Sequence, residues 1–178
     1  MNANVLTRKA VLSDSKKLSV LYKTVYIQTY GLEGVSDEFA NFITEQFSTA
    51  RLEKIIRDQP DNIIVAEYKG NLVGVVEIEF NKACPVGGIV GPELNKLYVL
   101  ERFCGRGIGR PLMQAAEELV ASKGIEEMWL WVLATNERAI RFYEKQQYKW
   151  IGNASFQMEA NSYENKVMRK KLSASSLQ

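Results

Sequence analysis

Residues 97–113 read LYVLERFCGRGIGRPLM, and this stretch decides the fold of the 178-residue chain. Leu94–Val99 is typical of a strand, and the apolar spacing from Ile108 onward predicts a helix that ends at Gly124. Between them stand three glycines at alternate positions, Gly105, Gly107 and Gly109. Such spacing leaves backbone N–H groups uncovered, and the following helix directs its positive end to the same place. The stretch therefore predicts an anion-binding loop suited to a pyrophosphate.

Two familiar nucleotide-binding loops do not fit these residues. A P-loop ends in Gly-Lys-Ser/Thr, whereas this loop ends in Gly109-Arg110-Pro111. The dinucleotide fingerprint requires a third glycine where Arg110 stands. A plain tight turn between strand and helix remains an alternative for the glycines. If an anion binds, Arg106 and Arg110 are candidates for charge-assisted contacts with it.

Outward from this loop, the chain predicts one mixed α/β domain over residues 1–172. Helices are expected at about 13–31, 36–43, 49–57, 108–124 and 136–145, and strands at 5–11, 63–68, 72–80, 94–99, 128–132, 148–151 and 163–172. The turn at 69–71 joins two of these strands as a hairpin. Residues 173–178 are polar, and we expect them to form a disordered tail.

The composition is that of an ordinary globular protein, with 46% hydrophobic and 25% charged residues. The first residues carry no secretory signal, and no apolar run approaches the ~18 residues that span a bilayer. We therefore expect a cytoplasmic protein. The net charge of +2 is too small to argue for a nucleic acid or an anionic membrane as partner.

The chain has no histidine, which excludes serine–histidine and cysteine–histidine nucleophilic sites and histidine-ligated zinc. Its two cysteines, Cys84 and Cys104, are too far apart in sequence to form a metal-binding knuckle, and no metal is expected. A disulfide between them would be unusual in a reducing compartment. Any chemistry must therefore use carboxylates, tyrosine, lysine or the backbone.

At these residues the sequence resembles the GNAT superfamily of N-acetyltransferases. The family's acetyl-CoA motif is a strand ending in valine, a loop Gln/Arg-x-x-Gly-x-Gly/Ala and a helix, and the frame from Cys104 to Gly109 matches it. A second motif follows the next strand as Asn136-x-x-Ala139-x-x-Phe142-Tyr143-Glu144-Lys145. Cys104 departs from the usual Gln/Arg, although a frame beginning at Arg102 also satisfies the pattern. Gln147-Tyr148 replaces the usual Gly-Phe, which leaves the local turn open.

The resemblance implies an α/β (α+β) fold with a mixed, mostly antiparallel sheet flanked by helices. It implies acetyl-CoA as co-substrate and an amine as acceptor, with a homodimer as an open alternative to a monomer. The pantetheine arm would enter a gap between strands 94–99 and 128–132, where main-chain groups of Leu97 and Val99 would bind it and the thioester carbonyl. The cofactor-binding residues implied are Leu97, Tyr98, Val99, Cys104, Gly105, Arg106, Gly107, Ile108, Gly109, Arg110, Asn136, Ala139, Phe142, Tyr143 and Lys145.

Two residues receive catalytic roles from the same resemblance. Tyr143 would protonate the departing CoA thiolate, since a phenol with a pKa near ~10 can donate to a nearby developing thiolate. A lone tyrosine would more often be an amphipathic core residue. Glu93 lies six residues before Val99, where some members keep a general base, but it also fits an exposed carboxylate at a strand start. Glu77 and Glu79 are alternatives that would act through water.

The acceptor is suggested by a segment without positive charge. No lysine or arginine occurs from Thr24 to Ala50, whereas four residues there are acidic: Glu33, Asp37, Glu38 and Glu45. In this family the segment borders the acceptor groove, and Thr24–Gly31 resembles the matching helix of bacterial spermine/spermidine acetyltransferases. A cationic acceptor such as a polyamine would then contact Tyr26, Tyr30 and Glu33.

Three alternatives stay open for this segment and for the chain. The acidic residues suit a helix start, and the tyrosines suit a core. The acceptor could be a protein or a small amine metabolite instead of a polyamine. A non-catalytic CoA-binding or regulatory module on the same fold is a different class of function, against which Asn136 and Tyr143 argue.

Overall fold

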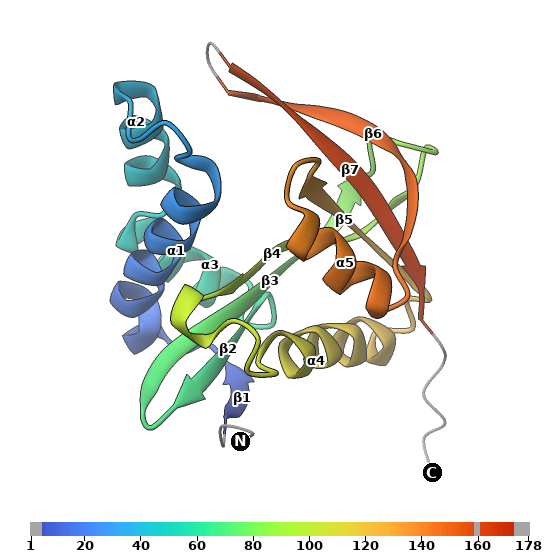
Figure 1. Ribbon diagram of the computed structural model, residues 1–178. Helices are drawn as coiled ribbons and strands as arrows, with labels where there is room; N and C mark the ends of the chain where they lie inside the picture. The colour runs from blue at the N-terminus through green and yellow to red at the C-terminus, as the bar shows by residue number, and fades with distance from the viewer. Residues whose placement is uncertain (1–4, 159–160, 173–178) are drawn as a thin grey trace. The chain divides into compact units, whose positions relative to one another are not determined.

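The computed structural model describes residues 5–158 and 161–172 (Figure 1). In chain order its elements are β1 (Leu6–Lys9), η1 (Leu12–Asp14), α1 (Ser15–Tyr30), α2 (Asp37–Gln46), α3 (Thr49–Asp58), β2 (Ile63–Tyr68), β3 (Asn71–Ala83), β4 (Val90–Val99), η2 (Glu101–Phe103), α4 (Gly109–Ser122), β5 (Glu127–Leu133), α5 (Glu137–Lys145), β6 (Lys149–Met158) and β7 (Asn161–Lys171). The strands follow the order β1-β2-β3-β4-β5-β7-β6. β4 and β5 are parallel, and β1-β2, β2-β3, β5-β7 and β6-β7 are antiparallel. The predicted mixed, mostly antiparallel α/β fold is confirmed.

The chain forms two compact units, each made of two chain segments. Unit 1 comprises residues 1–77 and 96–115, and unit 2 comprises residues 78–95 and 116–178. Three elements, β3, β4 and α4, therefore contribute residues to both units. No helix in the described part of the chain combines the length and apolar character needed to cross a membrane.

In unit 1, short polar signals fix the ends of the elements. Ser36 and Ser48 cap α2 and α3, because their hydroxyls accept hydrogen bonds from the N–H groups of Phe39 (3.2 Å) and Arg51 (3.3 Å). The β2-β3 hairpin turns at Lys69 and Gly70, whose φ angles of 51° and 79° suit a tight two-residue turn. These starts and this turn agree with the sequence prediction.

Several strands with residues in unit 2 are longer than predicted, and β3 is one of them, because it continues to Ala83 instead of ending at Phe80. β4 begins at Val90 instead of Leu94, and β6 continues to Met158 instead of ending at Ile151. β6 accommodates its glycine through a register shift between Trp150 and Gly152, and it pairs with β7 as far as Met158. A glycine inside a strand commonly marks such a bulge and not an end. The predicted tail at residues 173–178 lies outside the described residues.

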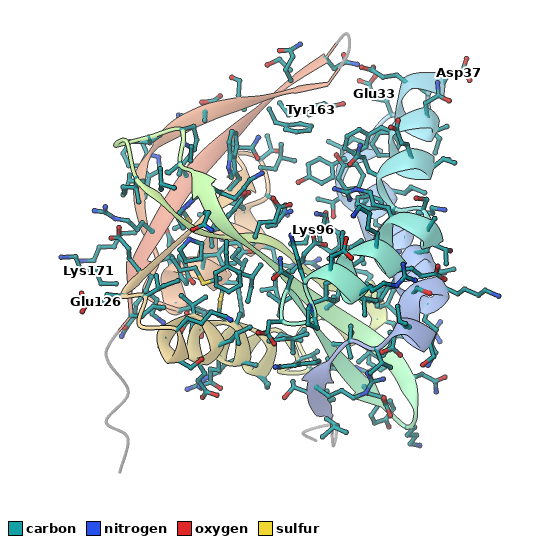
Figure 2. All side chains as sticks on the ribbon, turned by 180° about the vertical axis from the view of Figure 1, so that it is seen from behind. Glu33, Asp37, Lys96, Glu126, Tyr163 and Lys171 are labelled. Carbon is teal, nitrogen blue, oxygen red and sulfur yellow. The ribbon has the colours of Figure 1, made fainter. Side chains whose placement is uncertain are left out.

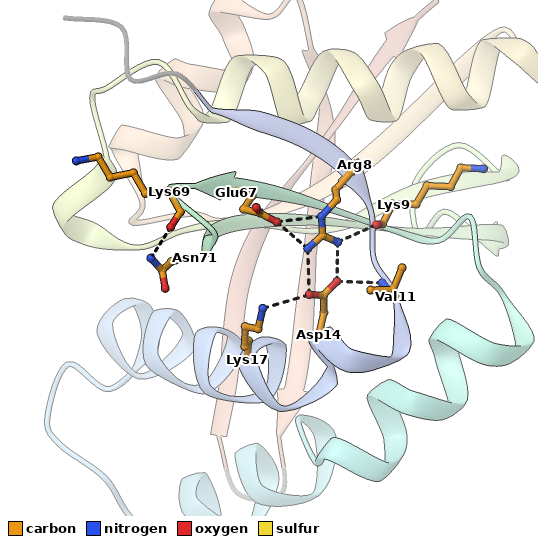
Figure 3. Close-up of polar contacts among 8 residues, drawn as sticks. All are labelled: Arg8, Lys9, Val11, Asp14, Lys17, Glu67, Lys69 and Asn71. Atoms are coloured by element: carbon orange, nitrogen blue, oxygen red, sulfur yellow. Dashed lines mark hydrogen bonds and ion pairs between the residues drawn. The ribbon is translucent and has the colours of Figure 1, made fainter.

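Unit 1 contains a network of hydrogen bonds and ion pairs around Arg8 (Figure 3). The Arg8 guanidinium donates to Asp14 at 2.7 and 3.1 Å and to Glu67 at 2.8 and 3.0 Å. The Val11 N–H also donates to Asp14, whose side chain is 1% exposed. Burial alone would raise the pKa of Asp14, but the Arg8 and Val11 hydrogen bonds and the Arg8 charge hold that pKa below its usual value. This network ties β1 to β2 and to the start of α1.

Candidate active site

The glycine-rich loop adopts the conformation that its spacing predicts. Gly105 and Gly107 have φ angles of 73° and 80°, and a Cβ built on either would meet nothing within 4 Å. Glycine adopts these angles readily, whereas residues with a Cβ adopt them only rarely. Ile108 is buried and anchors the loop, whereas Gly105, Arg106 and Gly107 are exposed. The loop is therefore held by one apolar side chain while its backbone faces outward.

The N–H groups of this loop are available to an anion. Among the described residues, those of Gly105, Gly107, Ile108 and Gly109 donate to no other backbone group. They lead into α4, which begins at Gly109 and whose N-terminus carries a partial positive charge. The Arg106 guanidinium lies 5.5 Å from the centroid of the Phe103 ring, which positions a full positive charge beside them. This combination of N–H groups, helix end and arginine suits a phosphate or pyrophosphate.

β4 leads into the loop. It pairs with β5 at Glu93–Trp129 and Leu94–Leu130, and Leu97, Tyr98 and Val99 follow these pairs along the strand. The Cys104 thiol donates to the Val99 carbonyl at 3.6 Å, and the Leu100 N–H donates to Val73 at 3.0 Å. Cys104 therefore contacts the end of β4 from within the loop.

In unit 2, the second motif forms α5. The Asn136 side chain accepts from the Ala139 N–H at 3.1 Å and so caps the helix. Tyr143 is 7% exposed, and its ring lies 5.5 Å from that of Phe142 and 6.0 Å from that of Tyr148. Ala139 and Phe142 are partly buried, and Lys145 is exposed. Aromatic packing therefore holds Tyr143 in place.

The candidate bases occupy different environments. Glu93 is 8% exposed within β4, so the alternative of an exposed carboxylate at a strand start is wrong. Glu79 receives a hydrogen bond from Asn95 and pairs with Lys82 at 2.8 Å. Glu77 is 2% exposed and accepts from the Tyr22 hydroxyl at 2.8 Å. Both Glu93 and Glu77 are buried carboxylates, and Glu79 is part of a more exposed pair.

The residues assigned to the acceptor divide into buried and exposed ones. Tyr26 is 7% exposed and packs against the rings of Tyr30 (4.4 Å), Phe39, Phe42 and Phe47. Burial raises the pKa of Tyr30. Glu33 and Asp37 are exposed near the connection of α1 to α2 (Figure 2). Tyr26 thus belongs to an aromatic core, and the carboxylates are the groups that a dissolved cation would meet.

One arrangement in unit 1 has no counterpart among the residues predicted from the sequence. Lys96, on β4, places its Nζ 3.3 Å from Glu77 Oε1 and 5.9 Å from the ring centroids of both Tyr22 and Phe47. A lysine inside a strand was the only local signal, because its partners Glu77, Tyr22 and Phe47 are distant in sequence. Among the described residues no three Cys, Asp or Glu side chains gather as metal ligands.

Comparison with known proteins gives one family. The model of the acetyltransferase (GNAT) family matches residues 31–148, which include both the glycine-rich loop and α5. This match spans well over half of the chain. The match therefore covers both motifs and the helices and strands between them, and not the glycine-rich loop alone.

Individual relatives agree with the family match. An uncharacterised N-acetyltransferase of Mycobacterium tuberculosis is 30% identical over 136 residues, which cover 76% of this chain and 83% of that protein. A spermidine N(1)-acetyltransferase of Thermoplasma acidophilum is 28% identical over 148 residues, covering 80% and 86%. The crystal structure of the T. acidophilum PaiA N-acetyltransferase in complex with coenzyme A has a TM-score of 0.70 at 22% identity, covering 94% and 99%.

Proposed function

This chain belongs to the GNAT family and is an acetyl-CoA-dependent N-acetyltransferase, and we propose that it passes the acetyl group directly to a primary amine of a polyamine. The observation that carries the choice of acceptor is the absence of lysine and arginine from Thr24 to Ala50, where Glu33, Asp37 and Glu45 are exposed. A local excess of negative charge raises the concentration of a polycation near the segment. The similarity to a spermidine acetyltransferase supports the same choice.

In the proposed complex the glycine-rich loop binds the pyrophosphate of acetyl-CoA. The uncovered N–H groups and the start of α4 supply hydrogen bonds and partial positive charge, and Arg106 and Arg110 supply full charges. The main-chain groups of Leu97 and Val99 bind the pantetheine arm. An N–H of this strand directed at the thioester carbonyl stabilises the oxyanion of the tetrahedral intermediate.

The chemistry needs one base and one acid. The acceptor is an ammonium ion in neutral water and must lose a proton before its nitrogen can attack. Glu93, a buried carboxylate, takes that proton, and the nitrogen lone pair then forms a bond to the thioester carbon. The carbon–sulfur bond breaks, and the departing thiolate takes a proton from Tyr143. The nitrogen loses its second proton, which restores the Tyr143 hydroxyl, and the proton held by Glu93 passes to water. The products are an N-acetylated amine and CoA.

A comparison of acceptors tests the proposal. We expect spermidine and spermine to give a kcat/KM at least about tenfold higher than free lysine or a peptide N-terminus, because a polycation is attracted by several carboxylates at once. We also expect this advantage to shrink between low and high salt, since added ions screen exposed charges. Steady-state release of the CoA thiol measures both. A peptide preferred over both polyamines would reject the polyamine and favour a protein substrate.

A further inference from the structure

The arrangement around Lys96 has the chemistry of an ammonium-binding site. We call the Tyr22 ring, the Phe47 ring and the Glu77 carboxylate the ammonium box. Lys96 Nζ lies 3.3 Å from Glu77 Oε1 and 5.9 Å from each ring centroid. The two rings meet edge to face at 5.4 Å. Aromatic faces combined with a carboxylate are a general means of recognising an alkylammonium ion.

The ammonium box is almost fully buried, whereas its occupant, Lys96, is slightly more exposed. Tyr22, Phe47 and Glu77 are 1%, 1% and 2% exposed, while the Lys96 side chain is 12% exposed. The Tyr22 hydroxyl donates to Glu77 Oε2 at 2.8 Å, so the box stays hydrogen-bonded through its own members. Lysine carries its charge on a flexible four-carbon stem. The box can therefore persist if the ammonium group of Lys96 moves away.

The position of the ammonium box connects it to the proposed reaction. All four residues belong to unit 1, and Lys96 directly precedes Leu97, whose main chain is proposed to bind the pantetheine arm. A lysine side chain ends in the same CH₂–NH₃⁺ group as a polyamine. We propose that the ammonium box binds one ammonium group of the acceptor, and that Lys96 occupies the box until the acceptor displaces it. This inference rests on the proposed function, because it takes the acceptor to be cationic.

The exchange has a quantitative consequence. A tethered ammonium acts as a competitor at an effective concentration in the millimolar range or above. The apparent affinity for the acceptor is then reduced in proportion to the fraction of molecules whose box is open. Lys96 would thus set the amine concentration at which the protein begins to bind its acceptor.

Replacing Lys96 with methionine tests this competition, because methionine keeps an unbranched side chain without the charge. We expect the KM for spermidine to fall about tenfold or more, while the KM for acetyl-CoA stays unchanged. Lys170→Met is the matched control. Lys170 Nζ lies 2.7 Å from Glu117 and 5.7 Å from the Tyr148 ring centroid, a similar lysine–glutamate–tyrosine group in unit 2. The control should leave the KM for spermidine unchanged.

Lys96→Arg keeps the charge and the ion pair with Glu77, so it also covers the case in which Lys96→Met fails to fold. A guanidinium binds a carboxylate through two parallel hydrogen bonds, so we expect the KM for spermidine to rise several-fold. An unchanged KM in the arginine variant, or an unchanged or higher KM in a folded methionine variant, would show that Lys96 and Glu77 are only a structural pair.

A thermal shift with propylammonium separates this inference from the proposed function, because it requires no turnover. The unfolding temperature of Lys96→Met should rise more with propylammonium than that of the wild type or of Lys170→Met. If spermidine is not acetylated but this shift occurs, the polyamine proposal fails and the ammonium box stands. If spermidine is acetylated but propylammonium raises the unfolding temperature of the three proteins equally, the ammonium box is rejected and the polyamine proposal is kept.

Discussion

Replacing Tyr143 with phenylalanine is expected to lower kcat by about 10²- to 10³-fold, the usual contribution of a general acid. The variant keeps the ring that packs against Phe142 and Tyr148, so α5 should remain folded. Without the hydroxyl, the CoA thiolate must leave unprotonated or take its proton from water. The KM for acetyl-CoA should change little, because the proton is donated only as the carbon–sulfur bond breaks. Steady-state kinetics with CoA thiol release measures both constants.

Tyr148→Phe is the matched control for this variant. Tyr148 is 2% exposed, and its ring lies 6.0 Å from that of Tyr143. The Tyr148→Phe variant also loses one phenolic hydroxyl from this cluster of rings. We expect its kcat to stay within about twofold of the wild-type value, because no proton transfer is assigned to Tyr148. An equal loss in both variants would mean that aromatic packing, and not proton donation, explains the effect. Full activity in Tyr143→Phe would remove the acid from the mechanism.

Replacing Gly107 with valine is expected to raise the KM for acetyl-CoA by about 10- to 100-fold, as the loss of two or more charge-assisted hydrogen bonds would. The φ of 80° is unfavourable for a β-branched residue, so the loop backbone must turn and its N–H groups must point elsewhere. A Cβ at this position would meet nothing within 4 Å, so steric clash is not the cause. Binding of acetyl-CoA measured by calorimetry checks the effect without turnover.

Gly70→Val separates loop geometry from general instability. Gly70 has a φ of 79° and equally open surroundings, but it lies in the β2-β3 turn. Both valine variants should lose about 1–2 kcal/mol of folding free energy from backbone strain. Only Gly107→Val should bind acetyl-CoA weakly. If both variants bind it as well as the wild type does, the pyrophosphate has to be assigned to another part of the chain.

The sequence was most informative where a local residue determines a local structure. Ser36 predicted the start of α2, and Asn136 predicted the start of α5, because the short polar side chains cap the free N–H groups of the first turn. Gly105 and Gly107 predicted the open loop, because glycine is the residue that accepts their positive φ angles. These signals require no knowledge of distant partners.

It was least informative where a distant partner determines the structure. β6 continues past Gly152 because its backbone pairs with β7, and glycine and polar residues hide that pairing from a hydrophobic pattern. The ammonium box joins Tyr22, Phe47, Glu77 and Lys96, which come from four separate elements or their ends. Tyr22 and Glu77 are 55 residues apart, so the sequence around either one gives no sign of their contact. Chemistry that depends on such contacts requires the structure.

The central claim is direct transfer of an acetyl group from acetyl-CoA to a polyamine amine, and mass spectrometry tests it most directly. The protein is first incubated with acetyl-CoA carrying ¹³C in its acetyl group, and spermidine is then added. We predict that the mass of the intact protein stays unchanged before spermidine is added, and that labelled monoacetylspermidine then appears in equal amount to free CoA. A stoichiometric acetylated protein that passes its label to spermidine would contradict direct transfer, and CoA release without labelled spermidine would contradict the acceptor.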